Sequence, residues 1–355
     1  MKSSFFLLPL SVVRESAVLK FEGNRDNFYA EAQRALEVGH FRVTDKDVPP
    51  PGGTLHDYWS MGPYWWPNPD NPDGLPYIRK DGHLNPDSMG NGYDRARIEG
   101  LVKTVGTLMS AWFVTGDKKY SKRIADLLRT FFIDADTRMN PSLTYGQAIP
   151  GICDGRGIGI IETVRLIELV NAIVYLQEEG EYPDDDLKEL CGWFGSYVDW
   201  LMTSQHGADE RAAKNNHGTW MDAQIVAFAL FTGRLDLARE VALEVPTRRI
   251  DIQIMGDGSQ PLELARTRAF SYSVYNLTAF ATLAQLARAV NVDLWNYLGP
   301  EGQSIPLAYE YLKPFATGEK PWTYRQIDKD TGVENSKLDK GSLDQYKALY
   351  SLRSL

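Results

Sequence analysis

The residues from Lys214 to Trp220 hold an ammonium, two carboxamides, an imidazole and an indole in one short stretch. Asn216 and His217 can donate hydrogen bonds to an anionic group. The apolar run from Met221 to Phe231 predicts a helix that begins here, and a helix N-terminus carries partial positive charge. The stretch therefore suits a carboxylate, such as that of an acidic sugar. The alternative is a helix cap at Asn215 or Asn216, with the indole in the core.

A second stretch, from Gly256 to Asn276, places two arginines a few residues before two tyrosines. Arg266 and Arg268 stay charged and can hold a carboxylate through two parallel hydrogen bonds. An arginine stabilises a nearby phenolate, so we expect a lowered pKa and a role in proton transfer for Tyr272 or Tyr275. The alternative is that both tyrosines are core aromatics at i, i+3 and that both arginines form surface ion pairs.

Residues 45–92 are rich in proline and glycine, which argues against a helix or a central strand. The segment from Tyr58 to Pro67 is too aromatic to be disordered. We therefore expect an ordered loop that packs over a cleft. Tyr64, Trp65 and Trp66 would form one wall of that cleft.

Helical periodicity dominates the rest of the chain. It predicts helices over residues 20–40, 98–115, 119–132, 158–177, 185–202, 219–231, 235–245 and 273–290. Strand-type alternation is clearest in the short segment from Ile250 to Ile254, and no sequence repeat is evident. Amphipathic helices with short turns allow an irregular bundle or a ring of antiparallel helix pairs. The length favours the ring, so we predict an all-α fold, an α/α toroid with long aromatic and proline-rich loops.

The composition excludes some classes of function. The chain has 355 residues, 43% of them hydrophobic, and a formal net charge of −9. A general nucleic-acid binder would normally show a basic face, so we expect no nucleic-acid partner. An acidic substrate would need a locally basic site within this acidic protein. No metal site is expected, because the five histidines are scattered and Cys153 and Cys191 lie far apart without ligand spacing.

The N-terminus allows two interpretations. The segment from Phe5 to Val13 is similar to a short secretory signal, although the flank from Arg14 to Ala17 makes a poor cleavage site. Residues 1–20 could equally be a first buried segment. No apolar run is long enough to span a bilayer. We expect a secreted or periplasmic protein on the first interpretation.

The two stretches, in this order, resemble the alginate lyase domain of polysaccharide lyases. The motifs that carry the resemblance are Asn215–Asn216–His217 with Trp220, Leu262–Arg266 running to Tyr272 and Tyr275, the loop Gly62–Tyr77, and Gly155–Gly159. The resemblance covers most of the chain and implies a single catalytic domain over residues 1–355. The chain looks closer to the branch of glucuronan and alginate lyases than to the periplasmic alginate lyases. In the periplasmic type the Arg–Tyr spacing is one residue longer than from Arg266 to Tyr272.

The resemblance implies β-elimination on a uronate polymer, without a metal or another cofactor, by a monomer. Asn216, His217 and Arg266 would neutralise the substrate carboxylate, and Tyr272 would donate a proton to the leaving oxygen. Tyr272 would also be the base where the C5 proton and O4 share a face, whereas His217 would be the base for opposite faces. Tyr275 is the alternative to Tyr272 as the catalytic tyrosine. The expected substrate-binding residues are Tyr64, Trp65, Trp66, Arg79, Arg156, Lys214, Trp220, Arg268 and Tyr275.

Two other functions remain open from the residues alone. A glycoside hydrolase on the same toroid would need two carboxylates that face the scissile bond. The candidates are Asp154, Asp222, Asp257 and Glu263, and no pair stands out. A non-catalytic protein that binds acidic polysaccharides would need aromatics and cations but no proton donor. The products distinguish the hydrolase, because only a lyase leaves an unsaturated uronate that absorbs ultraviolet light.

Overall fold

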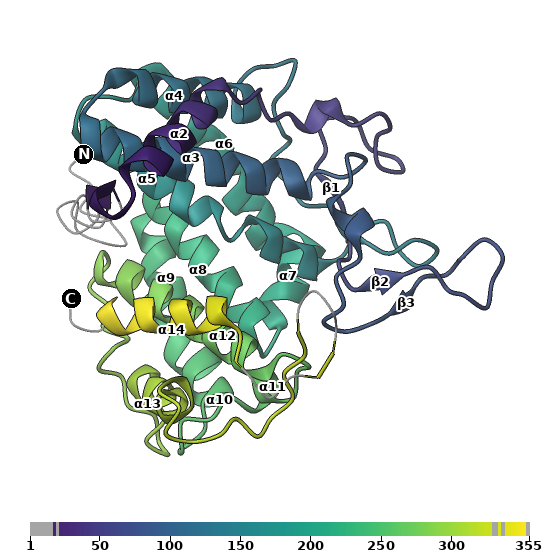
Figure 1. Ribbon diagram of the computed structural model, residues 1–355, viewed down its shortest axis with the longest axis vertical. Coiled ribbons are helices and arrows are strands. Elements are labelled where there is room, and N and C mark those ends of the chain that lie inside the picture. The colour runs from purple at the N-terminus through teal and green to yellow at the C-terminus, as the bar shows by residue number, and fades with distance from the viewer. Residues whose placement is uncertain (1–16, 19–20, 329–332, 335–337, 353–355) are drawn as a thin grey trace. The chain divides into compact units, whose positions relative to one another are not determined.

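The computed structural model describes residues 17–18, 21–328, 333–334 and 338–352 (Figure 1). The signal-like segment from Phe5 to Val13 lies outside the described residues. The chain divides into two compact units. The first comprises residues 1–62, 86–207 and 227–233, and the second comprises residues 63–85, 208–226 and 234–355. The single catalytic domain expected from the sequence stays a prediction.

Helices form most of the first unit. The predicted helices over 20–40, 98–115, 119–132 and 185–202 are confirmed as α2 (Arg25–Glu37), α3 (Arg95–Thr115), α4 (Lys118–Phe132) and α6 (Asp184–Thr203). Helix α3 ends at Gly116, whose φ of 65° is a left-handed conformation that glycine adopts without strain. Helix α4 begins directly afterwards, where the Asp117 side chain accepts a hydrogen bond from the Lys119 backbone. The two helices pack against each other, as expected for a short-turn helical pair.

The predicted helix over 158–177 is wrong at its start. Gly157–Thr163 form a 3₁₀ helix, and helix α5 occupies only Leu166–Glu178. Gly159 packs on the backbone of Gly146, where a Cβ atom on Gly159 would lie 2.5 Å from the Gly146 carbonyl carbon. This close backbone contact, rather than helical periodicity, fixes the path of the segment.

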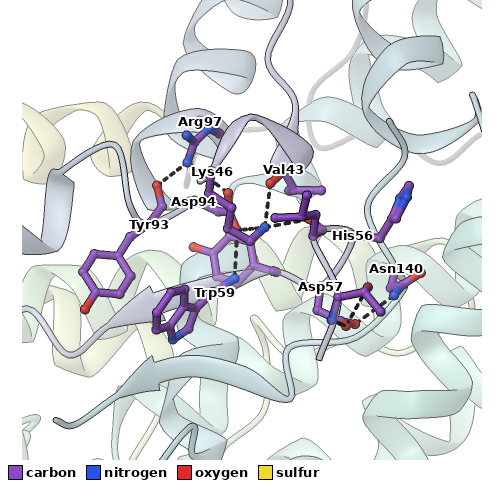
Figure 2. A network of polar contacts seen from close by, with 12 residues as sticks. Val43, Lys46, His56, Asp57, Trp59, Tyr93, Asp94, Arg97 and Asn140 are labelled. Atoms are coloured by element: carbon purple, nitrogen blue, oxygen red, sulfur yellow. Dashed lines mark hydrogen bonds and ion pairs between the residues drawn. The ribbon is translucent and has the colours of Figure 1, made fainter. Parts of the chain in front are cut away.

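A buried lysine anchors the proline-rich loop of the first unit (Figure 2). Lys46 Nζ donates to two backbone carbonyl oxygens at 2.6 and 2.8 Å and to Asp94 Oδ2 at 2.9 Å. Both side chains of this ion pair are fully buried. Asp94 also accepts a hydrogen bond from the backbone of Trp59 at 2.9 Å, at the start of strand β1 (Trp59–Met61). Strand β1 pairs in parallel with β4 (Tyr145–Ala148), so the loop is ordered, as predicted.

Helix α12 (Ala269–Arg288) is the central element of the second unit and packs against four other helices. These are α9 (Leu235–Val245), α11 (Pro261–Leu264), α13 (Ile305–Ala316) and α14 (Lys340–Leu352). The predicted helices over 235–245 and 273–290 are therefore confirmed. The predicted helix over 219–231 is also confirmed, as α8 (Asn216–Phe231). Helix α7 (Gln205–Ala212), which precedes it, was not expected.

Residues 63–85, here named the loop hairpin, contribute a short antiparallel pair to the second unit (Figure 1). Strands β2 (Trp65–Trp66) and β3 (Ile78–Arg79) have only two residues each. The Lys80 N–H donates to the Tyr64 carbonyl oxygen at 2.8 Å and extends the pairing. The residue that follows, Asp81, is thereby brought close to Tyr64.

The strand predicted at Ile250–Ile254 is wrong. A π-helical turn (Pro246–Ile250) runs directly into α10 (Asp251–Gln253). Ile250 and Ile254 are buried, whereas Ile252 is 43% exposed. Positions i and i+4 share a face in a helix, while all three isoleucines would share a face in a strand. The buried Arg249 also fixes the turn, since its Nε lies 2.7 Å from Asp222 Oδ2.

The all-α prediction is confirmed, because helices dominate and the described strands form only two short pairs. In the part of the chain that the structure describes, no helix combines the length and apolar character needed to cross a membrane.

Candidate active site

Tyr272 lies in the first turn of α12, and its phenol oxygen contacts two other polar groups. Arg266 Nη2 donates to this oxygen at 2.7 Å, and the Tyr64 phenol oxygen lies 2.9 Å from it. The Arg266 guanidinium also lies over the Tyr272 ring, with its Cζ 3.7 Å from the ring centroid. The structure therefore brings together the predicted arginine and tyrosine and adds Tyr64 from the loop hairpin.

The expected lowering of the Tyr272 pKa is wrong. Burial raises the pKa of Tyr272 well above its usual value of 10.0, and Tyr64 raises it further. Arg266 acts in the opposite direction but does not outweigh the burial. Tyr272 is therefore a neutral phenol at neutral pH, which is the form that can donate a proton.

Arg266 is paired with a carboxylate from the loop hairpin. Asp81 accepts hydrogen bonds from Arg266 Nε at 3.3 Å and from Arg266 Nη2 at 3.0 Å. The Thr267 hydroxyl donates to Asp81 at 3.1 Å, and Arg79 Nη2 donates to it at 2.7 Å. Burial raises the pKa of Asp81, but its bonds to Arg266 and Arg79 outweigh this and hold the pKa below its usual value. The Arg266 charge is thus partly compensated before any substrate binds.

Asn216 is bonded to a second carboxylate rather than open to a ligand. Its Nδ2 lies 3.0 and 2.8 Å from the two carboxylate oxygens of Glu263, and its backbone N–H donates to Glu263 at 2.7 Å. Asn216 and Glu263 are each 1% exposed. Burial raises the pKa of Glu263, and the bonds from Asn216 act against that rise. This geometry fits Asn216 as a positioning residue better than as a direct donor to the substrate.

The helix-cap interpretation of the same stretch applies to Asn215. Its Oδ1 accepts a hydrogen bond from the His217 backbone at 3.3 Å, and its carbonyl oxygen accepts one from Gly218 at 3.0 Å. Capping and site chemistry therefore fall on adjacent asparagines, which the sequence alone could not separate.

His217 is oriented by the buried Glu210 of helix α7. The His217 Nδ1 lies 2.7 Å from Glu210 Oε1, while the His217 side chain is 18% exposed. A proton on Nδ1 leaves Nε2 as an acceptor when the ring is neutral. His217 can therefore act as a base through Nε2, or donate to a substrate carboxylate only after Nε2 also gains a proton.

Trp220 and Tyr275 lie against each other, with ring centroids 5.2 Å apart. Trp220 is 7% exposed, so the core interpretation fits this indole better than stacking on a sugar. Arg268 Nη2 lies 3.6 Å from Asp339 Oδ2, as the ion-pair alternative expected. Tyr272, not Tyr275, is thus the tyrosine whose hydroxyl is bonded to Arg266.

The remaining predicted binding residues fall into two groups. Trp65 and Trp66 are partly exposed in the loop hairpin, Arg79 is largely exposed beside Asp81, and Lys214 is exposed before α8. Arg156 belongs to the first unit, where its Nε donates to the Gln147 carbonyl oxygen at 2.9 Å.

Comparison with known proteins places this chain in a family. The family model for alginate lyase matches residues 42–322. The chain belongs to the alginate lyase family. The lyase prediction is therefore confirmed at the level of a polysaccharide lyase.

Solved structures of alginate lyases share the fold. An alginate lyase from Bacteroides ovatus is 36% identical, with a TM-score of 0.90 over 99% of this chain and 92% of that chain. Alginate lyase A1-III from Sphingomonas species A1 is 16% identical, with a TM-score of 0.52 over 82% of this chain and 77% of that one. A Tyr-to-Phe variant of A1-III, complexed with tetrasaccharide, is 15% identical, with a TM-score of 0.56 over 88% and 78%. No curated protein matches the sequence. The shared fold agrees with the predicted α/α toroid.

The carboxylates considered for a hydrolase have other roles in this alginate lyase family member. Asp222 is fully buried and ion-paired with Arg249, and Glu263 is bonded to Asn216. Asp257 is exposed and bonded to the Ser259 backbone, while Asp154 is exposed in the first unit. The hydrolase alternative therefore gains no support.

Two site residues, Asp81 and Glu210, were missed from the sequence, and Glu263 was considered only as a hydrolase carboxylate. Glu210 lies seven positions before His217, and this spacing was the only available signal. Among the described residues, no group of three or more His, Cys, Asp or Glu side chains is arranged to hold a metal ion.

Proposed function

We propose that this protein cleaves a uronate polymer, alginate or glucuronan, by β-elimination and leaves a 4,5-unsaturated uronate end. The observation that carries the proposal is the neutral Tyr272 phenol, bonded to Arg266 at 2.7 Å and to Tyr64 at 2.9 Å. This arrangement joins a proton donor to a fixed cation. Binding alone would need no such pair, which disfavours a non-catalytic role.

Arg266 is the cation for the substrate carboxylate. The proton on C5 is weakly acidic, and it becomes more acidic when the charge that develops on the carboxylate is stabilised. When the C5–H bond breaks, its electron pair forms the C4–C5 double bond and the C4–O4 bond breaks. Tyr272 gives its phenol proton to O4 and completes the departure of the leaving chain.

The base depends on which face of the sugar carries the C5 proton. Where this proton and O4 lie on opposite faces, as in guluronate, neutral His217 accepts it through Nε2. Glu210 supports that role because it bonds to Nδ1 at 2.7 Å. Where both lie on one face, as in mannuronate or glucuronate, Tyr272 must first lose its own proton. Its raised pKa makes this second route the more demanding one.

The exposed part of the loop hairpin supports binding of a polymer. Trp65 and Trp66 are partly exposed, and Lys80 Nζ lies 5.1 Å from the Trp66 ring centroid. Aromatic faces beside cations suit sugar rings that carry carboxylates. We also propose that the protein is secreted or periplasmic, because a long polymer is met outside the cytoplasm. We further propose that it acts as a monomer, as the family resemblance implies.

The test uses purified protein with polymannuronate, polyguluronate and glucuronan in parallel. We expect ultraviolet absorbance of the unsaturated uronate to rise with at least one polymer. New reducing ends without this absorbance would instead indicate hydrolysis, and binding without either signal would indicate a non-catalytic protein. Relative rates on the three polymers report which face of the sugar the base serves.

A further inference from the structure

Asp81 of the loop hairpin holds the Arg266 guanidinium through two hydrogen bonds. The two residues lie 185 positions apart in the sequence, yet Asp81 bonds to both Nε and Nη2 of Arg266. This is the two-point geometry in which a carboxylate fixes the plane of a guanidinium. The same Nη2 donates to the Tyr272 phenol oxygen. Arg266 Nη1 has no hydrogen bond among the described residues.

The backbone next to Asp81 is built to hold this contact. Gly82 is buried with a φ of 78°, and a Cβ atom there would lie 2.5 Å from Thr267 Oγ1 and 2.6 Å from Ile327 Cδ1. Only glycine fits both the conformation and the space. The loop hairpin is therefore packed tightly against the residue that follows Arg266, and Thr267 supplies a further hydrogen bond to Asp81.

We propose that Asp81 is a positioning residue of the lyase reaction: it fixes the Arg266 guanidinium against Tyr272 and partly compensates its charge. The inference rests on the proposed function. Asp81 keeps Nε and Nη2 away from the substrate, so Nη1 is the group that meets the substrate carboxylate. The loop hairpin thus supplies Tyr64 and Asp81, and each contacts one member of the Arg266–Tyr272 pair.

Charge compensation by Asp81 has a consequence for catalysis. A bare arginine binds the carboxylate of the ground state strongly, which lowers KM without raising kcat. An arginine already paired with Asp81 binds the ground state less strongly. Its fixed donors still stabilise the larger charge that develops on the carboxylate in the transition state. Asp81 should therefore raise kcat and raise KM together.

The decisive variant is Asp81→Asn, which keeps the size of the side chain but removes its charge and one acceptor. We expect kcat to fall about 100-fold, since loss of orientation of this order follows small displacements of a catalytic group. KM for the polymer should fall as well, because Arg266 is then uncompensated. Asp81→Glu, which restores the charge, should recover part of kcat. Thr267→Val is the matched control, because it removes one hydrogen bond to Asp81 and leaves the Arg266 pair intact.

A merely structural role gives a different result. If Asp81 only anchors the loop hairpin, Asp81→Asn and Thr267→Val lower kcat alike with KM unchanged or raised, and the inference is overturned. Wild-type kcat in Asp81→Asn also overturns it. If the wild type forms no unsaturated product, the proposed function fails, and the Kd of a uronate oligomer becomes the readout. A lower Kd in Asp81→Asn than in the wild type then supports charge compensation, whereas an equal or higher Kd overturns it.

Discussion

The phenol oxygens of Tyr64 and Tyr272 lie 2.9 Å apart, although 208 positions separate the two residues in the sequence. Tyr64 comes from the loop hairpin and Tyr272 from the first turn of α12. The aromatic loop was expected to form a wall for sugar rings. It also contacts Tyr272, the proposed proton donor, so we propose that the loop hairpin takes part in catalysis as well as in binding.

Tyr64→Phe should lower kcat modestly. The change removes one hydrogen bond to Tyr272, and a net contribution of about 1 kcal/mol corresponds to roughly a fivefold effect. The rate of unsaturated-product formation measures this. Tyr77→Phe, in the same hairpin, is the control, because the Tyr77 hydroxyl has no hydrogen bond among the described residues. Equal rates in both variants would contradict a role for the Tyr64 hydroxyl.

Glu210→Met should lower kcat about 100-fold, because the His217 ring loses the acceptor that sets its tautomer and orientation. Glu210→Gln should lower kcat by a smaller factor, since its amide oxygen can still accept a hydrogen bond from His217 Nδ1. Glu244→Gln is a control at a half-buried carboxylate that pairs with Arg211 and Arg248 instead. Near wild-type turnover in Glu210→Met would show that His217 needs no such partner.

The pH dependence of kcat should show that neutral Tyr272 is the active form. Burial, followed by Tyr64, raises the Tyr272 pKa, while Arg266 lowers it and the nearby Asp81 raises it. A raised pKa keeps the phenol protonated up to and beyond the ordinary tyrosine value of about 10. Initial rates on polyguluronate should therefore not rise between neutral pH and that value. A wild-type rate that rises over this range would instead identify the phenolate as the working form.

Lys46→Met should destabilise the protein by about 3 kcal/mol, because it removes one of the two cations paired with the buried Asp94 carboxylate and leaves only Arg97. Both side chains are fully buried in the network of Figure 2. Urea unfolding of the wild type, Lys46→Met, Asp94→Leu and the double variant Lys46→Met/Asp94→Leu measures the coupling. The double variant should lose less stability than the sum of the two single losses. A loss in the double variant equal to the sum of both single losses would argue against a coupled pair.

The helices and the functional stretches could be predicted from the sequence because local patterns of residues mark them. Helices such as α3 and α4 follow from apolar periodicity and from their glycine and aspartate boundaries, and the functional stretches were recognisable by residue type. The alternation in Ile250–Ile254 led to the wrong prediction of a strand, because isoleucines at i and i+4 fit a helix face as well as a strand face. Helix α7 carries many polar residues and little apolar periodicity, so Glu210 was not placed beside His217.

The Asp81–Arg266 pair and the Tyr272 pKa could not be predicted from the sequence because they depend on contacts between distant positions. Asp81 meets Arg266 across 185 positions, and no local pattern marks a single aspartate in a polar loop as the partner of one arginine. The Tyr272 pKa was mispredicted for a related reason. The arginine was visible in the sequence, whereas the burial and the Tyr64 contact that outweigh it arise only on folding.

The assignment of Tyr272 as the proton donor is tested by comparing Tyr272→Phe with Tyr275→Phe in a single assay of unsaturated uronate formation, with polymer binding measured alongside. We expect Tyr272→Phe to form no detectable product while it binds the polymer as the wild type does, and we expect Tyr275→Phe to stay active. Near-full activity of Tyr272→Phe with loss of activity in Tyr275→Phe would contradict the assignment of the proton donor.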